Sequence, residues 1–204
     1  MTPSRCYVAP GRSSSLQAEL TNDELGAALR EHAYLEGDFV LRSGRRSRYY
    51  LDKYRFETRP DLLGPLGERI AQVVAEHDPE AVRLAGPELG AVPLAAAASL
   101  ASGLPFLIVR KEAKEYGTAN RLEGVFEPGE SVCLIEDVVT SGGAAVQAIE
   151  ALRDARLTCR TAVCVVDREE GGMDALGRVA VRLRPLFRAS ELLGLEKAPQ
   201  KRDG

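Results

Sequence analysis

The stretch that decides the fold of this chain is Val132–Gly143, which reads Val-Cys-Leu-Ile-Glu-Asp-Val-Val-Thr-Ser-Gly-Gly. Four apolar residues open it, and a run of this length is typical of a buried strand rather than a helix. Two carboxylates, Glu136 and Asp137, follow at the point where the strand is expected to end. A loop of small residues comes next, and helical spacing of apolar residues begins after it at Val146. The stretch therefore predicts a strand, a loop and a helix in succession.

A strand, a glycine-rich loop and a helix in this order are well suited to binding an anion. The backbone N–H groups of the loop and the positive end of the helix both face the ligand. The glycines let a phosphate approach the backbone closely, and Thr140 and Ser141 add hydroxyl donors. The two acids suit the hydroxyl groups of a ribose, with a divalent cation nearby. We therefore expect a sugar phosphate whose ring hydroxyls face Glu136 and Asp137.

The competing interpretation of this stretch is an ordinary strand–turn–helix connection. A Ser-Gly-Gly turn alone would favour that interpretation, but an acid pair directly between strand and loop favours the sugar-phosphate site. The stretch is not a Walker A loop, because it lacks the Gly-Lys-Ser/Thr ending. Its 12-residue pattern resembles the signature with which type I phosphoribosyltransferases bind phosphoribosyl diphosphate (PRPP).

The composition of the whole chain argues against several other classes of function. The chain has 204 residues, of which 45% are hydrophobic, enough for one sizeable core. A net charge of −3 gives no global electrostatic case for binding nucleic acid. The longest nearly apolar run, Ala91–Ala101, contains Pro93 and Ser99 and is too short to span a bilayer.

The cysteines and histidines do not have the spacing of a metal site. Three of the four cysteines lie in apolar, strand-like runs, where we expect small core residues. The two histidines, His32 and His77, are far apart in sequence, so a zinc site is not expected. The segment Met1–Gln17 is polar and has no signal-peptide core. These features together predict a reduced, cytoplasmic compartment.

One α/β domain is predicted between a polar leader and a polar tail. Residues 1–17 are expected to be a disordered leader and residues 196–204 a polar tail. The domain covers residues 18–195, with a hood at 18–60 and a core at 61–195. Because strands alternate with helices from about residue 61 onward, the core is expected to be a doubly wound, mainly parallel sheet flanked by helices.

Apolar periodicity and turn residues give the individual elements. The hood begins with a helix that Thr21 and Glu24 cap and that Gly37 ends, followed by a hairpin over Asp38–Asp52. The expected core helices are 61–77 and 91–102, the expected strands are 81–85, 105–109, 132–135, 159–166 and 179–186, and a helical turn follows at 190–193.

Polar or glycine-rich loops follow four of these strands, at Gly86–Gly90, Arg110–Gly124, Glu136–Gly143 and Asp167–Gly172. In a parallel doubly wound sheet such loops meet at one edge, which predicts a single binding site there. The basic loop Arg110–Gly124 is either a mobile, solvated loop or the source of charge for a pyrophosphate leaving group. The arginines of the hairpin, Arg42, Arg45, Arg46 and Arg48, leave a similar choice between a solvated turn and a basic lid.

Four segments together resemble the orotate phosphoribosyltransferase family: Phe39–Asp52, Arg110–Gly124, Val132–Gly143 and Asp167–Gly172. The PRPP signature marks only the superfamily, whereas the Arg-Lys-x-x-Lys-x-Tyr-Gly-Thr and Asp-Arg-x-x-Gly-Gly loops narrow it to the orotate branch. The resemblance implies the type I phosphoribosyltransferase fold with a small helix-plus-hairpin hood. It also implies Mg²⁺-dependent transfer of phosphoribose from PRPP to orotate, giving orotidine 5′-monophosphate and pyrophosphate in pyrimidine synthesis.

The resemblance further implies roles for individual residues. The catalytic residues would be Lys111, Lys114 and Asp137. The orotate-binding residues would be Arg168, which pairs with the orotate carboxylate, and Thr140, Arg42, Tyr50 and Leu51. Mg²⁺ would be held mainly through PRPP and water, without a dedicated protein cage. The implied PRPP-binding residues are Arg110, Lys111, Lys114, Glu136, Asp137, Val138, Val139, Thr140, Ser141, Gly142, Gly143, Ala144, Glu88, Leu89 and Gly90.

The resemblance implies a homodimer in which the basic loop 110–124 completes the neighbour's site, with no nucleic acid or membrane partner. Some members carry a Tyr-Lys pair where this chain has Leu89-Gly90. Either the backbone N–H groups of Glu88–Gly90 then serve alone, or Lys53 compensates. Many bacterial members also have His where Tyr116 stands, and some members have Lys where Arg42 stands.

Two alternative functions remain on the sequence alone. The first is a phosphoribosyltransferase for another base, against which Arg168 argues because a purine has no carboxylate to pair with it. The second is a PRPP-binding regulator without catalytic activity. The retained cations of the basic loop, and the lack of a basic recognition helix before the core, argue against this second alternative.

Overall fold

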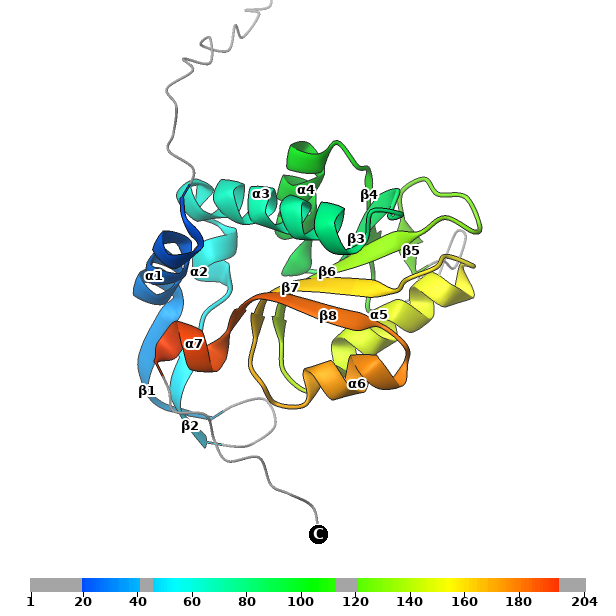
Figure 1. Cartoon of the computed structure of the whole chain (residues 1–204). Coiled ribbons are helices and arrows are strands. Elements are labelled where there is room, and N and C mark those ends of the chain that lie inside the picture. The colour runs from blue at the N-terminus through cyan, green and yellow to red at the C-terminus, as the bar shows by residue number, and fades with distance from the viewer. Residues whose placement is uncertain (1–19, 41–45, 113–120, 195–204) are drawn as a thin grey trace, which may run out of the picture.

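The structure is a computed structural model that describes residues 20–40, 46–112 and 121–194 (Figure 1). The predicted leader and the predicted tail, together with Arg42, Lys114 and Tyr116, lie outside these residues. The elements are α1 (Asn22–Ala33), β1 (Tyr34–Val40), β2 (Arg46–Leu51), α2 (Tyr54–Glu57), α3 (Pro60–His77), β3 (Arg83–Pro87), α4 (Ala91–Ser102), β4 (Phe106–Val109), β5 (Leu122–Glu123), β6 (Val132–Val139), α5 (Gly143–Asp154), β7 (Thr161–Asp167), α6 (Gly172–Arg178), β8 (Arg182–Arg188) and α7 (Ala189–Leu193).

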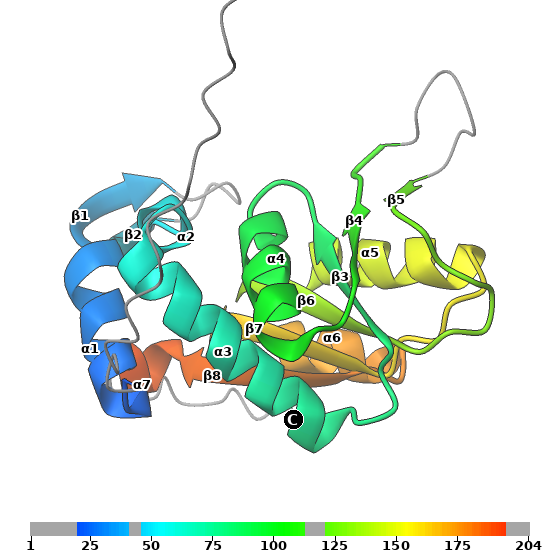
Figure 2. The same ribbon diagram turned by 90° about the horizontal axis from the view of Figure 1, so that it is seen from above.

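A six-stranded sheet in the order β5-β4-β3-β6-β7-β8 forms the centre of the molecule. Its neighbouring strands are parallel except for the edge strand β5, which runs antiparallel to β4. Helices α3 and α4 cover one face of the sheet, and α5 and α6 cover the other (Figures 1 and 2). This arrangement confirms the predicted doubly wound, mainly parallel sheet.

The strand order reverses between β3 and β6. After β3 the chain moves outward to β4, and it then returns to the other side of β3 to build β6, β7 and β8. In doubly wound sheets, ligands bind outside the carboxyl ends of the strands at this topological switch point. The loops that follow β3 and β6, Glu88–Gly90 and Thr140–Gly142, therefore flank the expected site.

The first four elements and the C-terminal helix α7 gather at one end of the sheet (Figure 1). Strands β1 and β2 form an antiparallel hairpin, which confirms the predicted hairpin. Helix α1 begins with the predicted capping box: the backbone N–H of Glu24 donates to Thr21 Oγ1 at 3.3 Å, and that of Thr21 donates to Glu24 Oε2 at 2.8 Å. The buried side chains Leu29 and Phe56 pack into the same apolar cluster as α3 and the sheet.

The two faces of the sheet carry separate apolar clusters because strand side chains alternate in direction. Along β6, Cys133 and Ile135 belong to the cluster under α3 and α4, whereas Val132 and Leu134 belong to the cluster under α5. The described cysteines are free and buried, which confirms their predicted role as small core residues; they are Cys133, Cys159 and Cys164.

Two predicted element ends are wrong. The strand predicted at 132–135 continues to Val139, because Val138 and Val139 still pair with β7, so the acid pair lies inside the strand. The first helix ends at Ala33 rather than at Gly37. Tyr34 is already extended and pairs with Leu51 of β2, so the chain enters the hairpin directly.

Smaller differences concern short elements and strand starts. Helices α2 and α6 and strand β5 were not predicted, because elements of seven residues or fewer show little periodicity. The strands predicted to start at 81, 159 and 179 begin at Arg83, Thr161 and Arg182, where their pairing with neighbouring strands starts.

Candidate active site

A cavity of about 500 Å³ lies at the switch point of the sheet. It is lined by the loops after β3 and β6, by the first turns of α5, by the start of the basic loop, and by Lys53 and Tyr54. Every predicted PRPP-binding residue that the structure describes lines this cavity; these are Glu88, Leu89, Gly90, Arg110, Lys111, Glu136, Asp137, Val138, Val139, Thr140, Ser141, Gly142, Gly143 and Ala144. Lys114, the remaining one, lies outside the described residues.

Two helices begin at the wall of this cavity. Gly142 is the N-cap of α5 and Gly90 is the N-cap of α4, and both line the cavity. Gly142 has a φ of +81°, a conformation that residues with a side chain rarely adopt. Helix N-termini leave backbone N–H groups without intrahelical partners and carry a partial positive charge. The cavity is therefore suited to a ligand with more than one phosphate group.

The two acids of β6 have different environments although both line the cavity. The carboxylate of Asp137 accepts hydrogen bonds from Lys53 Nζ at 2.5 Å and from the Val138 backbone N–H at 2.5 Å. Burial, and then the charge of Asp137, raise the pKa of Glu136 to about 8. At neutral pH Glu136 is therefore mainly protonated, whereas Asp137 carries the charge that Lys53 neutralises.

A further acid, Glu57, completes a group that we call the Lys53 cluster: Lys53, Glu57 and Asp137. Glu57 is 2% exposed, and burial followed by the charge of Asp137 raises its pKa to about 8. Gly90 leaves the space for this cluster, because a Cβ there would overlap Asp137 Oδ2 and lie 2.5 Å from Lys53 Nζ. Sequence reasoning missed Glu57. The available signal was that Glu57 follows Lys53 by four residues, a spacing that places both side chains on one face of a helix.

The start of the basic loop is fixed at the mouth of the cavity. The backbone N–H of Lys111 donates to Glu88 Oε1 at 2.8 Å, and Arg110 Nε lies 4.0 Å from Glu88 Oε2. Arg110 Nη1 also lies 3.5 Å from Glu123 Oε1, across the β4–β5 pair. Glu88 thus links the loop after β3 to the loop after β4, and it places two cations at the cavity.

Arg168 lies beyond β7 and is nearly buried, with a side chain that is 9% exposed. Its guanidinium carbon is 5.2 Å from the centre of the Tyr49 ring, and its Nη2 is 3.1 Å from Glu170 Oε1. Its buried Nε has no hydrogen-bond partner in the described part of the chain. The Arg168 backbone N–H donates to Val139 O at 2.9 Å, which ties this residue to the end of β6. Sequence reasoning missed Tyr49, because nothing local indicates a partner so distant along the chain.

The other predicted orotate-binding residues have varied positions. Thr140 lines the cavity. Tyr50 is partly exposed, and its ring centre lies 5.6 Å from that of Phe39. The side chain of Leu51 is buried in the apolar core, so it does not line the cavity. Arg42 lies outside the described residues.

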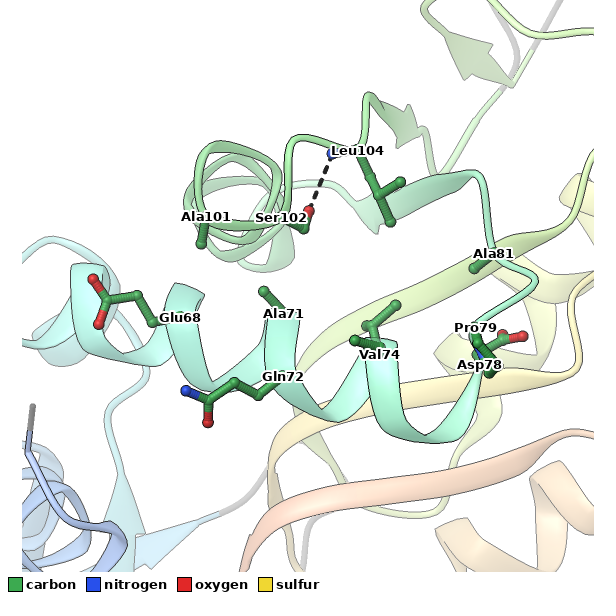
Figure 3. Close-up of a pocket in the computed structure, with 11 residues that line it drawn as sticks. Glu68, Ala71, Gln72, Val74, Asp78, Pro79, Ala81, Ala101, Ser102 and Leu104 are labelled. Atoms are coloured by element: carbon green, nitrogen blue, oxygen red, sulfur yellow. Dashed lines mark hydrogen bonds between the residues drawn. The ribbon is translucent and has the colours of Figure 1, made fainter.

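A second cavity, of about 560 Å³, lies between α3 and α4 near the amino ends of β3 and β4 (Figure 3). Its lining is mostly alanine and aliphatic, and the Leu104 backbone N–H donates to Ser102 Oγ at 3.2 Å at its edge. Asp78 lines it as well, and burial raises the pKa of this carboxyl. Since no group of cations converges there, the cavity at the switch point remains the candidate active site.

Comparison with known proteins identifies close relatives of this chain, although no family model matches it. The orotate phosphoribosyltransferase of Methanocella arvoryzae is 52% identical over 158 residues, a match that covers 78% of this chain and 89% of the relative. The crystal structure of orotate phosphoribosyltransferase from Aeropyrum pernix is 34% identical with a TM-score of 0.75, and the match covers 83% of this chain and 96% of that one.

A third relative has been solved with a ligand. The orotate phosphoribosyltransferase of Mycobacterium tuberculosis, in complex with 5-phospho-α-D-ribosyl 1-diphosphate (PRPP), is 28% identical with a TM-score of 0.71. The match covers 84% of this chain and 98% of that one.

In the described part of this chain, no helix has the length and apolar character needed to cross a membrane.

Proposed function

The chain belongs to the orotate phosphoribosyltransferase family, and from this premise we propose that the cavity at the switch point is its active site. The protein transfers phosphoribose from PRPP to orotate, giving orotidine 5′-monophosphate and pyrophosphate in pyrimidine biosynthesis. One observation supports this placement above all: every described residue predicted to bind PRPP lines the same cavity.

Three groups of residues in the cavity bind the three parts of PRPP: the 5′-phosphate, the ribose and the diphosphate. The loop Val138–Ala144 binds the 5′-phosphate through its backbone N–H groups and hydroxyls. The acids Glu136 and Asp137 bind the ribose hydroxyls. Arg110 and Lys111 hold the diphosphate, and Lys53 is close enough to the cavity to add the cation that the loop Glu88–Gly90 lacks.

The reaction is a displacement at C1′ of the ribose. The bond to the diphosphate oxygen breaks as the bond to a ring nitrogen of orotate forms, through an oxocarbenium-like transition state. Positioning of the two substrates and stabilisation of the charge that develops on the leaving diphosphate supply much of the rate. Because orotate is already an anion with an acidic N–H, the site requires no strong base.

The donor set of the cavity fits Mg²⁺ bound together with PRPP. Mg²⁺ prefers oxygen ligands and is usually held by one or two carboxylates, substrate phosphates and water. Carboxylates and a diphosphate would both be present here, so we propose that the ion is held mainly through PRPP and water. When bound, it would neutralise part of the diphosphate charge.

The orotate end of the site is proposed to lie at Arg168. The buried Nε of this guanidinium has no hydrogen-bond partner among the residues that the structure describes, and a carboxylate would supply one. The Tyr49 ring lies against the guanidinium and restricts its orientation. Orotate would replace or share the contact that Arg168 makes with Glu170.

We further propose a homodimer in which the basic loop 110–124 acts in the neighbour's site. Helix α4 supports an interface, since all its residues other than Ser99 and Ser102 are apolar and Leu100 on it is 90% exposed. A second subunit would cover such a face.

The buried free cysteines fit a reducing compartment, and we propose a cytoplasmic location.

The proposed function is tested with a panel of bases. The protein is incubated with PRPP, Mg²⁺ and one base at a time, and pyrophosphate release is followed. Orotate is expected to support release, whereas adenine, hypoxanthine and uracil are not. Release with a purine and none with orotate would favour a phosphoribosyltransferase for another base, and PRPP binding without release would favour a regulator.

Replacing Asp137 by asparagine is expected to weaken PRPP binding by roughly 10- to 150-fold, because charged hydrogen bonds contribute ~1.5–3 kcal/mol each. Asparagine keeps the shape of the side chain, so the fold should survive. Calorimetry with PRPP and Mg²⁺ measures the effect, and a thermal melt checks the fold. A folded variant with unchanged affinity would remove the ribose role of Asp137.

A further inference from the structure

Glu57 is a buried acid that the proposed mechanism does not use. It lies on the one-turn helix α2, where its neighbour Phe56 already supplies the apolar contact with the core. Its Oε1 is fully buried and has no hydrogen-bond partner among the described residues. A buried carboxyl without a partner lowers stability, so its presence here calls for a role in the adjacent site.

The surroundings of Glu57 connect it to the PRPP site. A Cβ placed on Gly90 would lie 3.0 Å from Glu57 Oε1 and 2.5 Å from Lys53 Nζ, and it would overlap Asp137 Oδ2. The three side chains of the Lys53 cluster therefore converge on one small volume beside the loop after β3. The Glu57 carboxyl group therefore lies beside the Asp137 carboxylate, and the charge of Asp137 contributes to the raised pKa of Glu57.

Two ionised carboxylates cannot bond to each other, since both are acceptors, so a hydrogen bond between them needs a proton on one. Burial raises the pKa of Glu57 to about 8, and its carboxyl is therefore mainly protonated at neutral pH. Asp137 keeps its charge and accepts from Lys53. With this assignment, the O–H of Glu57 is available to donate to the Asp137 carboxylate, which would give the buried carboxyl group a hydrogen-bond partner.

We propose that Glu57 is a positioning residue of the PRPP site, whose carboxyl group acts together with Lys53 to fix the Asp137 carboxylate that receives the ribose hydroxyls. This inference rests on the proposed function of the cavity. Glu57 touches Asp137 rather than substrate, so its effect on PRPP is indirect. Removing the Glu57 carboxyl group should leave the Asp137 side chain free to rotate away from the ribose.

The charged groups that act on the Glu57 carboxyl are Asp137 of β6, Lys53 beside it on the chain, and Asp52 after β2. The pKa of Glu136, on the same strand as Asp137, is also raised to about 8. A pH profile of PRPP binding would therefore combine the titrations of Glu57 and Glu136. Comparing Glu57 variants at one pH isolates the contribution of Glu57.

The test compares Glu57→Leu with Glu57→Gln in the full chain at pH 7. Leucine removes the donor and fills the space, whereas the glutamine amide can still donate to Asp137. We expect Glu57→Leu to raise the PRPP dissociation constant by about 10-fold or more in calorimetry with Mg²⁺, in line with the loss of a charge-assisted hydrogen bond. We expect Glu57→Gln to stay within about 3-fold of the wild type.

The matched control is Asp78→Leu. Asp78 is also a buried carboxyl, and its Oδ2 has no hydrogen-bond partner within residues 20–40, 46–112 and 121–194, but it lies after α3, beside the cavity between α3 and α4 (Figure 3). Its substitution is expected to leave PRPP affinity unchanged. Melting temperatures are recorded for all variants, so that PRPP affinities are compared only between folded proteins. If the leucine variant does not fold, Glu57→Met takes its place.

The outcomes distinguish this inference from the proposed function. If the wild type binds no PRPP, the assignment of the cavity fails and takes this inference with it. If the wild type binds PRPP and folded Glu57→Leu binds it equally well, only the role of Glu57 is overturned. Equal weakening by Glu57→Gln and Glu57→Leu would also overturn it, because the glutamine retains a donor.

Discussion

Replacing Arg168 by lysine is expected to raise the KM for orotate by roughly 10- to 150-fold, the equivalent of one charged hydrogen bond of ~1.5–3 kcal/mol. Lysine keeps the positive charge but loses the planar fork that binds a carboxylate with two parallel hydrogen bonds. It also loses the contact of the guanidinium with the Tyr49 ring. PRPP affinity should change much less. Steady-state kinetics with each substrate varied in turn, and calorimetry with PRPP, measure the two effects.

Arg83→Lys is the matched control for this experiment. Arg83 makes a two-pronged contact with Glu130, at 2.9 and 3.0 Å, and lies at the amino end of β3, away from the candidate site. Its substitution should cost some stability without changing the KM for orotate. If Arg168→Lys instead weakens PRPP binding and spares orotate, the base is bound elsewhere and the assignment of Arg168 fails.

Much of the sheet could be predicted because each strand and helix of the core carries its own local pattern. The runs around Val132 and Val163 read as strands from apolar composition alone, and the helix at 91–102 was predicted with its observed bounds. Such local patterns did not predict the order of the strands in the sheet. It depends on which strands pair, and the position of β6 beside β3 rather than beyond β4 is set by contacts between distant segments.

The part of the cavity proposed to bind the 5′-phosphate was predictable for a related reason. Loop Thr140–Gly142, strand β6 and helix α5 are adjacent in sequence, so one stretch contains the strand, the turn and the helix N-terminus. The parts that sequence reasoning missed join distant segments. Lys53 and Asp137 are 84 residues apart, and the contact of Arg168 with Tyr49 links β2 to the end of β7. No local pattern indicates either pairing.

For the acid pair Glu136 and Asp137, the local pattern predicted which residues line the site but not their burial or their charged neighbours. Two carboxylates after an apolar run were predicted to lie at a strand end and to bind ribose together. Because the strand continues to Val139, both are buried, and Lys53 donates a hydrogen bond to Asp137. Burial then raises the pKa of Glu136. The ion pair between Asp137 and Lys53 depends on a residue from another part of the fold, which no local pattern indicates.

Mixing two inactive variants, Lys114→Ala and Asp137→Ala, is expected to restore activity to roughly a quarter of the wild-type value, if the basic loop acts in the neighbour's site. Lys114→Ala alone should lower kcat strongly with a smaller effect on the KM for orotate, because its contact with the diphosphate strengthens as charge develops. Asp137→Ala alone should prevent productive PRPP binding. The measurement is pyrophosphate release after the two preparations have exchanged subunits.

The expected quarter follows from two-fold symmetry. Random exchange makes about half of the dimers mixed, and a mixed dimer has one site with both lesions and one with neither. Half of the dimers with half of their sites intact gives roughly a quarter of full activity. If each loop served its own subunit, both sites of a mixed dimer would carry a lesion, and mixing would restore nothing.

Exchange must be shown independently, for example by co-purification of subunits that carry different tags. Each variant taken alone through the same procedure is the control, and it should remain inactive. Continued inactivity of the mixture, after exchange has been shown, would overturn the shared site while leaving the proposed chemistry intact. In that case Arg110 and Lys111, which the structure places at the cavity of their own subunit, would mark the loop as acting within one chain.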